Sequence, residues 1–301
     1  NIKLVLKQQS KIILGTVQFG ISYGISNNLG KTSKKNSLDI LEYAYSNGIK
    51  YLDTAPSYGD SESVIGELND KNYWRIISKT PSFSGNFITE ESVEKLVNYF
   101  NLSRIKLSQN VIYGLLIHSC DDLFKPGGDK LFKAMEKLKQ DGYVKKIGVS
   151  VYNVRQIDSI LEKYSVDLVQ LPINILDQRF IVDGRLVKLK RYGVEVHARS
   201  ALLQGLLMMP INNISSWFDP IKGVLEKFHM EAEKLGVSDL QLALSFVQSI
   251  HEVDNIVLGV NTLEQLHEVL SMPLINNINI DDFSFLSVND DRFINPSNWI
   301  I

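Results

Sequence analysis

The sequence predicts a (β/α)8 barrel that occupies the whole chain, residues 1–301. Two observations predict this fold: short apolar runs alternate with amphipathic helical patterns eight times, and no linker or change in composition interrupts the alternation. The runs are apolar throughout because a parallel sheet in such a fold is covered on both faces. The predicted strands are Ile12–Leu14, Tyr51–Asp53, Ile76–Ser78, Tyr113–Ile117, Lys146–Val149, Leu168–Leu171, Glu195–Ala198 and Ile256–Leu258.

Helical periodicity is clearest in two of the segments between these runs, Ser37–Asn47 and Leu131–Gln140. The residues expected on the buried face of the first are Leu38, Leu41, Ala44 and Tyr45. Those expected on the buried face of the second are Leu131, Ala134, Met135 and Leu138. Gly48 and Gly142 are natural stops after these helices. A polar residue with Gln three positions later resembles a capping box, and marks further helix starts at Asn153–Gln156, Ser238–Gln241 and Thr262–Gln265.

A doubly wound sheet is the alternative fold, and one segment argues against it. That fold requires a glycine-rich phosphate-binding turn after its first strand. The segment Gly15–Gly20 reads GTVQFG and lacks the G-x-G-x-x-G spacing. The tail Asn276–Ile301 is irregular, polar and aromatic, so we expect it to fold over a mouth of the barrel rather than extend the barrel.

Composition and charge exclude several classes of function. The formal net charge of −2 provides no global basic field for nucleic acid. No apolar run approaches the roughly 20 residues that a membrane helix needs. The single cysteine, Cys120, excludes an internal disulfide and is typical of a reducing compartment. The segment Asn1–Ser10 lacks the apolar core and cleavage site of a signal peptide, so we expect a cytoplasmic location.

Four chemically reactive side chains follow three neighbouring strands of the predicted barrel. Asp53 ends the second strand, and Tyr58 follows in the same loop. Lys79 follows the third strand and His118 the fourth. Functional groups of a barrel collect at the carboxyl ends of its strands, so we expect these side chains to meet at one rim.

These four side chains suit the reduction of a carbonyl, which requires hydride at carbon and a proton at oxygen. A phenol is a weak acid with a reference pKa of about 10. We expect the ammonium of Lys79 to lower the pKa of Tyr58 towards working pH. Asp53 would hold Lys79 charged and oriented, and His118 would orient the carbonyl oxygen or relay a proton.

Each residue alone has a simpler interpretation, such as a helix cap, loop packing or a solvated rim position. Their joint occurrence on consecutive strands favours catalysis. A metal-dependent hydrolase would instead need a cluster of His and carboxylates at strand ends. Only His118 and His197 lie near predicted strand ends, which disfavours that class.

The motifs around these residues resemble the aldo/keto reductase superfamily. The segments that carry the resemblance are Leu14–Gly20, Leu52–Gly59, Ser61–Glu62, Gly66, Ser78–Lys79, Leu115–His118, Lys146–Ser150, Gln170, Gly259 and Thr262–Leu266. They occur in order and span essentially the whole chain. The resemblance implies a nicotinamide-dependent reductase in which the four reactive side chains are catalytic and Tyr58 is the proton donor.

The resemblance also implies a set of cofactor contacts. Gly15–Thr16 would lie near the nicotinamide end of the cofactor. Ser150 and Gln170 would bind the carboxamide, and the segment after strand seven would approach the pyrophosphate. The full implied set is Gly15, Thr16, Ser150, Gln170, Arg199, Ser200, Leu202, Gly259 and Gln265.

Four positions depart from the family pattern. Val151 stands where members commonly have Asn, and Arg199 stands where an aromatic residue often stacks under the nicotinamide. Gly259 and Gln265 stand where many NADP-dependent members have Lys and Arg for the 2′-phosphate, and charge-assisted contacts are the strong ones. NADPH remains the cofactor that the resemblance implies, and the loss of these positive charges makes NADH the alternative.

The substrate is less well defined by the sequence. The run Asn174–Arg179 and the stretch His197–Leu207 resemble bacterial reductases associated with surface-polysaccharide or modified-sugar biosynthesis, although the leucines of the stretch could simply pack a loop. We expect a small-molecule carbonyl substrate, such as a sugar or keto-sugar. Arg199 could contact a cofactor phosphate or an acidic or nucleotide-linked substrate.

A nicotinamide-binding sensor or regulatory subunit is the competing function. Such a protein could lose the four reactive side chains without penalty, and their presence favours an enzyme. The sequence leaves the oligomeric state open.

Overall fold

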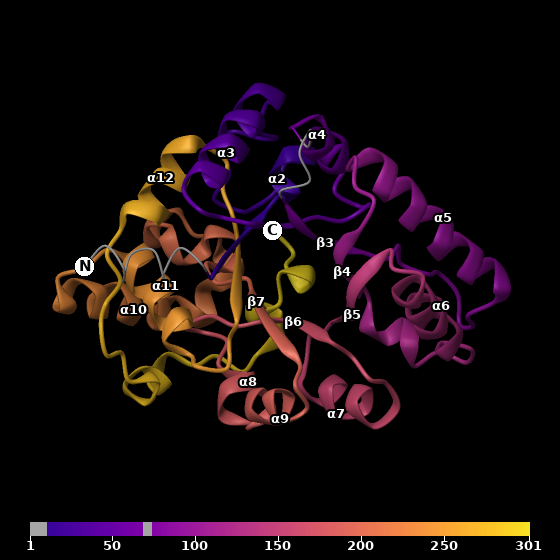
Figure 1. Cartoon of the computed structure of the whole chain (residues 1–301). Helices are drawn as coiled ribbons and strands as arrows, with labels where there is room; N and C mark the ends of the chain where they lie inside the picture. Colours follow the sequence, from indigo (N-terminus) through magenta and orange to yellow (C-terminus); the bar gives the residue numbers. More distant parts are fainter. Residues whose placement is uncertain (1–10, 69–73) are drawn as a thin grey trace.

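Eight parallel strands form a closed barrel in the computed structural model, which describes residues 11–68 and 74–301 (Figure 1). The strands are β1 (Ile12–Gly15), β2 (Tyr51–Asp53), β3 (Arg75–Lys79), β4 (Ile112–Ile117), β5 (Val144–Ser150), β6 (Leu168–Pro172), β7 (Glu195–Arg199) and β8 (Asn255–Gly259). Each strand pairs with its neighbours in sequence, and β8 closes the barrel against β1. The predicted fold is confirmed, and the predicted strand ends shift by at most two residues. The segment Asn1–Ser10, where we looked for a signal peptide, lies outside the described residues.

Helices connect the strands and cover the outside of the barrel (Figure 1). The longer ones are α3 (Lys34–Ser46), α4 (Ser61–Leu68), α5 (Glu90–Lys106), α6 (Asp129–Gln140), α7 (Val154–Lys163), α9 (Arg185–Arg191), α10 (Lys222–Leu235), α11 (Asp239–Ser249) and α12 (Leu263–Ser271). The short ones are α2 (Val17–Gly20), α8 (Arg179–Val182) and α13 (Asp291–Ile294). The 3-10 segments are η1 (Cys120–Leu123), η2 (Leu203–Met208), η3 (Ile211–Asn213), η4 (Ser216–Ile221), η5 (Ile280–Leu286) and η6 (Pro296–Asn298).

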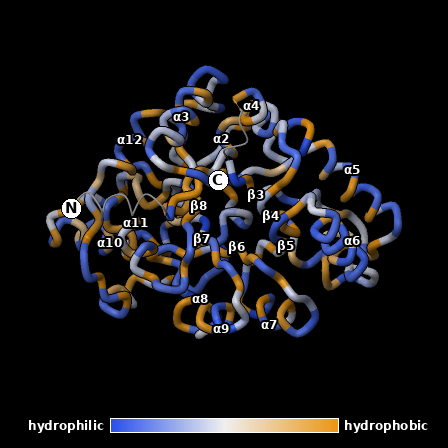
Figure 2. The backbone as a smooth tube through the Cα atoms, viewed as in Figure 1, coloured by the Kyte–Doolittle hydropathy of each residue, from blue (hydrophilic) through white to orange (hydrophobic). Residues whose placement is uncertain are grey.

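Hydrophobic and hydrophilic segments alternate along the outer helices, as expected for helices with one face on a sheet (Figure 2). Within residues 11–68 and 74–301, no helix combines the length and the apolar character needed to cross a membrane.

The two helices expected from periodicity are present, with corrections to their buried faces. The helix α3 begins after Ser33, whose side chain accepts a hydrogen bond from the backbone N–H of Asn36. Its buried residues are Ser37, Ile40, Leu41 and Ala44. Leu38 is only partly buried and Tyr45 is exposed, because both flank the stripe that recurs every three or four residues from Ser37. In α6 the buried residues are Leu131, Phe132, Met135 and Leu138, and Ala134 is only partly buried.

The expected helix ends are largely confirmed. Gly48 and Gly142 directly follow the C-caps of α3 and α6 with φ of +85° and +82°. The box at Asn153–Gln156 is complete, with both reciprocal hydrogen bonds. At Ser238 and Thr262 the cap side chain accepts the backbone N–H of the Gln three residues later.

The inner surface of the barrel is layered because side chains on a strand alternate between its two faces. A middle layer is apolar and separate from the core that lies between the strands and the helices; its buried members are Ile13, Ile77, Leu116 and Leu168. Further along each strand, or directly after it, one more residue faces inward at the carboxyl end of the barrel. These eight positions, here called the upper layer, are Gly15, Asp53, Lys79, His118, Ser150, Gln170, Arg199 and Gly259.

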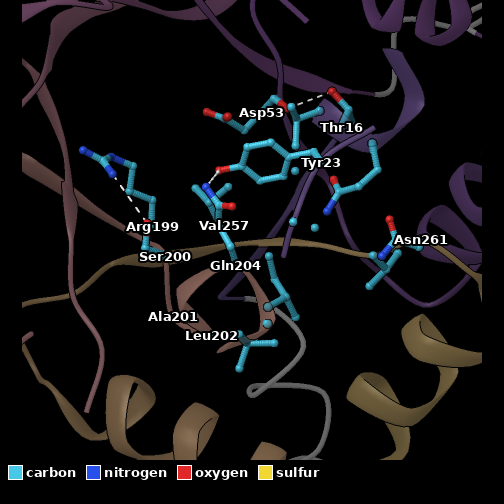
Figure 3. A pocket seen from close by; sticks show the side chains of 18 of the residues that line it. Thr16, Tyr23, Asp53, Arg199, Ser200, Ala201, Leu202, Gln204, Val257 and Asn261 are labelled. Carbon is cyan, nitrogen blue, oxygen red and sulfur yellow. Dashed lines mark hydrogen bonds between the residues drawn. The ribbon is translucent and has the colours of Figure 1, made fainter. Parts of the chain in front are cut away.

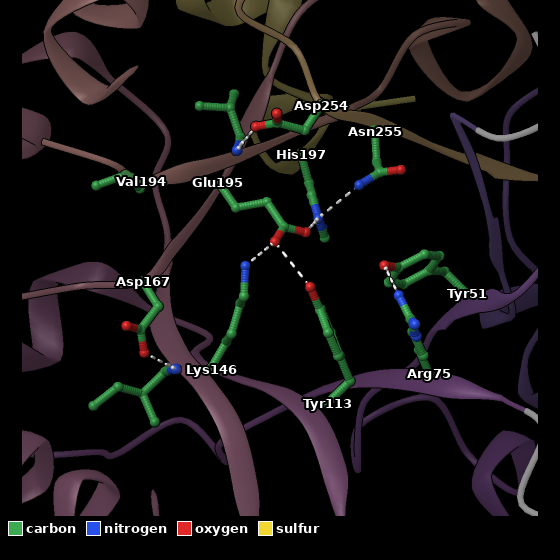
Figure 4. Close-up of polar contacts among 12 residues, drawn as sticks. Tyr51, Arg75, Tyr113, Lys146, Asp167, Val194, Glu195, His197, Asp254 and Asn255 are labelled. Carbon is green, nitrogen blue, oxygen red and sulfur yellow. Dashed lines mark hydrogen bonds and ion pairs between the residues drawn. The ribbon is translucent and has the colours of Figure 1, made fainter. Parts of the chain in front are cut away.

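A polar network lies at the amino end of the barrel (Figure 4). Its members, here called the lower network, are Tyr51, Arg75, Tyr113, Lys146, Glu195 and His197. Glu195 accepts hydrogen bonds from the hydroxyl of Tyr113 at 2.9 Å and from the ammonium of Lys146, and it lies 2.6 Å from Nε2 of His197. His197 is the central residue of β7, so the expectation that it lies near a strand end is wrong.

The tail at residues 276–301 packs on the loops that follow β6 and β7. The backbone N–H of Val288 donates to the carbonyl of Leu176 at 2.8 Å. Asp291 pairs with Arg179 at 2.5 Å, and the ring of Trp299 meets Phe218 edge-on with centroids 5.0 Å apart. The tail thus lies at the carboxyl end of the barrel, but it contributes no residue to the cavity described below.

Candidate active site

A cavity of about 550 Å³ lies at the carboxyl ends of the strands (Figure 3). This volume is within the range of small-molecule sites. All the residues assigned to a site from the sequence line it: Gly15, Thr16, Asp53, Tyr58, Lys79, His118, Ser150, Gln170, Arg199, Ser200, Leu202, Gly259 and Gln265. The structure therefore brings the whole expected set together, and the role of each residue stays a prediction.

Lys79 and Asp53 form a buried ion pair in this cavity. The Nζ atom of Lys79 lies 2.7 Å from Oδ1 of Asp53 and donates a second hydrogen bond to the carbonyl of Thr54 at 3.0 Å. The other carboxylate oxygen accepts a hydrogen bond from Nε2 of Gln170 at 2.8 Å. The side chains of Lys79 and Asp53 are only 1% and 5% exposed, so each charge depends on the other for compensation.

Two glycines determine the shape of the loop that carries Tyr58. A Cβ atom on Gly20 would lie 1.6 Å from the carbonyl oxygen of Tyr58, and one on Gly59 would lie 2.4 Å from the carbonyl oxygen of Gly20. Gly59 also has a φ of +56°, in the left-handed region. The glycines of these two motifs therefore act through backbone packing, which sets the position of Tyr58.

Tyr58 lies between the other reactive groups and holds its proton. Nζ of Lys79 lies 5.1 Å from its ring centroid, and the imidazole of His118 meets the ring edge-on at 6.3 Å. Burial raises the pKa of Tyr58 above its ordinary value, and the carboxylate of Asp53 raises it further. The expected fall of this pKa towards working pH is wrong, because burial and the carboxylate of Asp53 outweigh the effect of nearby positive charge. Tyr58 is a neutral phenol in this cavity.

His118 is an uncharged imidazole at neutral pH. Burial, together with the positive charge of Lys79, lowers the pKa of His118 to about 4. A neutral imidazole carries one N–H donor and one acceptor nitrogen. His118 can therefore orient a carbonyl oxygen by hydrogen bonding, and as a neutral imidazole it can also relay a proton.

Thr16 directly follows β1 and is hydrogen-bonded to the backbone of Asp53 at the end of β2. Its backbone N–H and its hydroxyl donate to the carbonyl of Asp53 at 3.0 and 2.9 Å. The hydroxyl of Ser61 lies 2.8 Å from Oγ1 of Thr16. Thr16 thus fixes the backbone position of Asp53 through two hydrogen bonds to the same carbonyl.

The part of the cavity beside β8 and α12 is polar. A Cβ atom on Gly259 would lie 2.5 Å from the side-chain nitrogen of Gln18, so the amide of Gln18 fills the space next to this glycine. Gln265 keeps its capping role, because its backbone N–H donates to Oγ1 of Thr262 at 3.3 Å and its Oε1 accepts from the N–H of Asn261 at 2.7 Å. The cations among the described residues that line the cavity are Lys79 and Arg199, and both are borne on other strands.

This polar part fits a nucleotide cofactor. Oε1 of Gln18 and Oδ1 of Asn261 are buried, and neither has a hydrogen-bond partner among the described residues. Buried polar atoms are normally satisfied, so unpaired acceptors at a cavity wall are ready for the hydroxyl groups of a ligand. The donor and acceptor set of the cavity is therefore compatible with a nicotinamide dinucleotide.

The loops after β1 and β7 meet at the cavity. Nε2 of Gln204 donates to the hydroxyl of Tyr23 at 3.1 Å (Figure 3). Ser200, Leu203 and Gln204 have φ of +60°, +49° and +54°, a region that residues other than glycine seldom adopt. Such backbone strain is concentrated at functional loops, and here it turns the β7 loop back towards Tyr23.

Several lining residues were missed from the sequence: Gln18, Tyr23, Tyr152, Gln204, Asn261 and Glu268. They lie in loops, in the short segments α2 and η2, or on α12, where no strand period indicates which way a side chain points. A signal existed for two of them. Gln18 lies inside the GTVQFG segment, and Asn261 directly precedes the cap residue Thr262.

The segments that suggested a sugar-related enzyme have structural roles. Arg179 binds the buried carboxylate of Asp177 at 2.7 Å, and Leu203, Leu206 and Leu207 are fully buried. Leu202 lines the cavity. The association with polysaccharide or sugar biosynthesis therefore rests on sequence resemblance alone.

Comparisons with known proteins agree with this architecture. The model of the Aldo/keto reductase family matches residues 11–287. Among curated relatives, the uncharacterized oxidoreductase YqkF of Bacillus subtilis is 24% identical over 79% of this chain and 82% of its own length. The NADH-specific methylglyoxal reductase of Escherichia coli is 24% identical over 84% of this chain and 86% of its own length. The aldo-keto reductase AKR11C1 of Bacillus halodurans, in its holo form, has the same fold, with a TM-score of 0.73, 18% identity and coverage of 96% and 95% of the two chains.

Proposed function

The chain belongs to the aldo/keto reductase family, and from this premise we propose that it reduces an aldehyde or ketone to an alcohol with hydride from NADH or NADPH. The observation that supports this most directly is the buried pair of Lys79 and Asp53 beside a protonated Tyr58 and a neutral His118. A protein that only sensed the cofactor would not need this arrangement, and an ion pair in a dry site is costly to keep without a purpose.

The proposed reaction uses each of these groups once. The carbonyl oxygen accepts a hydrogen bond from His118, which orients it towards Tyr58. A bound nicotinamide would provide the hydride that the carbonyl carbon receives. Tyr58 gives its proton to the oxygen, so the product is a neutral alcohol, and water then returns a proton to the phenolate. Lys79 stabilises the transient phenolate, and Asp53 keeps Lys79 charged.

The cofactor would lie along the wall formed by β1, β7 and β8. Gly15–Thr16, Ser150 and Gln170 would contact its nicotinamide end. Ser200 and Leu202 would approach the pyrophosphate. These assignments come from the family resemblance, and the shared cavity supports them.

We infer only weak discrimination between NADPH and NADH. A 2′-phosphate gains most from charge-assisted contacts, whereas Gln18, Asn261 and Gln265 are neutral and Glu268 is acidic. The N-terminus of α12 offers a modest favourable field for an anion, which leaves NADPH binding feasible. The name of the relative from Escherichia coli, an NADH-specific reductase, supports NADH as a cofactor of this chain.

We propose small aldehydes and ketones as the substrate class, with methylglyoxal as a first candidate because a relative is named for it. A sugar or keto-sugar is the second candidate, supported by the resemblance of the Asn174–Arg179 run. We keep the cytoplasm as the expected location.

The decisive test replaces Tyr58 with Phe. Loss of the general acid should lower kcat by about 10²–10⁴-fold, while Kd for NADH stays within about threefold because the ring remains. Oxidation of NADH and NADPH would be followed with methylglyoxal, glyoxal, aldoses and keto-sugars. The control is Tyr192→Phe, since Tyr192 is 63% exposed on the surface. A Phe variant that keeps more than about half of the wild-type kcat would refute Tyr58 as the proton donor.

A further inference from the structure

Arg199 is a cation in the cavity wall, and it forms no ion pair with a carboxylate of residues 11–68 and 74–301. Its Nη2 donates to the carbonyl of Val151 at 3.0 Å, its Nη1 lies 3.5 Å from the hydroxyl of Ser200, and its guanidinium carbon lies 4.3 Å from the ring centroid of Tyr152. Its Nε is buried, and within the described part of the chain it has no hydrogen-bond partner. Lys79, the other cation of the cavity, is neutralised by Asp53 at 2.7 Å. The charge of Arg199 acts on Asp177, but Asp177 is bound to Arg179, so Arg199 has no carboxylate of its own within the described part of the chain.

This charge lies at the reacting end of the cavity. Arg199 belongs to the upper layer, in which it shares the barrel rim with Lys79 and His118. The positive charge of Arg199 lowers the pKa of Tyr58, which burial raises, and it lowers the pKa of His118, which burial also lowers. Arg199 therefore lies close enough to both groups to act on them electrostatically. Figure 3 shows Arg199 and Asn261 on opposite sides of Tyr23. The guanidinium is thus remote from the polar part of the cavity beside β8.

A guanidinium in such a place favours an anion. Arg199 is partly buried, and its contacts with Val151 and Tyr152 carry no negative charge. The planar fork of an arginine matches the geometry of carboxylates and phosphates. The carbonyl of Val151 uses one N–H of Nη2 and the hydroxyl of Ser200 lies near one of Nη1, so a second N–H on each nitrogen remains for a ligand.

We propose that Arg199 binds an anionic group of the substrate, a carboxylate or a phosphate, so that the preferred substrates are aldehydes or ketones that carry such a group near the carbonyl. This inference rests on the proposed reductase activity. It assigns Arg199 to substrate specificity rather than to the cofactor contact that the family resemblance implied.

Matched substrates test the proposal. One pair is 4-carboxybenzaldehyde and 4-carbamoylbenzaldehyde, which differ in charge but hardly in shape. The second pair is glyceraldehyde 3-phosphate and glyceraldehyde. We expect the wild-type enzyme to prefer the anionic member of at least one pair by about tenfold or more in kcat/KM. The pair with the larger preference distinguishes carboxylate from phosphate.

The variant Arg199→Gln should remove this preference by raising KM for the anion, so that kcat/KM for the anionic member falls at least about tenfold further than for the neutral member. Arg199→Lys should restore part of the preference, because lysine supplies the positive charge but not the planar set of N–H donors. Arg191→Gln is the matched control, because Arg191 is exposed on α9. Kd for NADH should be unchanged in all three, which also reports an intact cavity.

Three results would overturn the proposal. One is a wild-type enzyme that does not favour either anion. Another is an Arg199→Gln variant that keeps the preference. The third is an equal loss on both members of each pair with a rise of about tenfold in Kd for NADH, which would assign Arg199 to the cofactor and leave the reductase activity intact. An enzyme that turns over no carbonyl compound would instead refute the proposed function, and this inference with it.

Discussion

The reactivity of the site and the stability of the barrel both depend on the ion pair between Lys79 and Asp53. Each side chain is nearly inaccessible, so removal of one partner leaves an uncompensated buried charge. We predict that Lys79→Met lowers the free energy of unfolding by about 3–5 kcal/mol and also abolishes turnover. Urea denaturation measures the first effect and cofactor oxidation the second.

The double variant Asp53→Asn with Lys79→Met is the informative control. Because it removes both charges, it should be more stable than the single Lys79→Met variant while remaining inactive. If the two substitutions simply added their costs, the buried pair would not be the source of the loss.

The titration of the reactive groups predicts a broad working range of pH. His118 has a pKa of about 4, and the pKa of Tyr58 is raised above its ordinary value. Neither group changes its charge between about pH 5 and pH 9. We therefore predict that kcat/KM is nearly constant over this interval. At lower pH, kcat/KM should fall because His118 gains a proton. A bell-shaped profile with a pKa near neutrality would contradict this assignment.

The residues of the site were predictable to the extent that strands carry them. Asp53, Lys79 and His118 end strands, so their direction follows from the position of the strand. The charge state of Tyr58 was not predictable, because it depends on burial and on the ion pair that occupies Lys79. Gln18 was missed because its side chain fills a space left by Gly259, which is distant in sequence.

At the scale of elements, the strands were predicted well because buried parallel strands have few polar residues. The long helix α5 was not singled out, since its buried residues are only Leu96, Phe100 and Ser103. The 3-10 segments from η2 to η6 have no period long enough to detect. Two of the three left-handed residues of η2, Leu203 and Gln204, are not glycines, so only Gly205 could have indicated the turn from the sequence.

The junction of β8 and α12 should control the choice of cofactor. We predict that Gln265→Arg lowers Kd for NADPH by about tenfold, because a charged donor gains a strong contact with the 2′-phosphate. Kd for NADH should stay within about threefold. Fluorescence titration at two salt concentrations measures both values.

Gln265→Met is the matched control for this variant. It also removes the acceptor for the N–H of Asn261, but it adds no charge. An equal gain in NADPH affinity from Met and Arg would show that loss of the cap, and not the charge, is responsible.

At the scale of the molecule, the barrel has a different polar group at each end. The lower network surrounds Glu195, and the apolar middle layer separates most of it from the cavity. Burial raises the pKa of Glu195, but hydrogen bonds from His197, Lys146 and Tyr113 outweigh it and lower the pKa to about 2. Because the pKa is depressed on folding, the stabilisation is present above the unfolded value of about 4.3 and is lost as pH falls towards 2.

This linkage yields a prediction for Glu195→Gln. The variant should have a lower Tm than the wild type near neutral pH, and the difference should shrink as pH falls below about 4. The kcat should change by less than about twofold, since the network lies at the opposite end from the cavity. Glu233→Gln, at an exposed position of α10, is the control. A constant difference in Tm from pH 7 to pH 3 would show that the charge of Glu195 is not involved.

The upper layer limits how the substrate range of this barrel can diverge. Asp53, Lys79 and His118 are committed to chemistry, and Gln170 is committed to Asp53. Gly15 has little room, since a Cβ there would lie 3.3 Å from Val257, whereas a Cβ on Gly259 would meet only the end of the flexible Gln18 side chain at 2.5 Å. Of the eight positions of the upper layer, this leaves Ser150, Arg199 and Gly259. A saturation library at these three positions samples the new pockets that the strands can offer, and any wider repertoire must be sought in the loops.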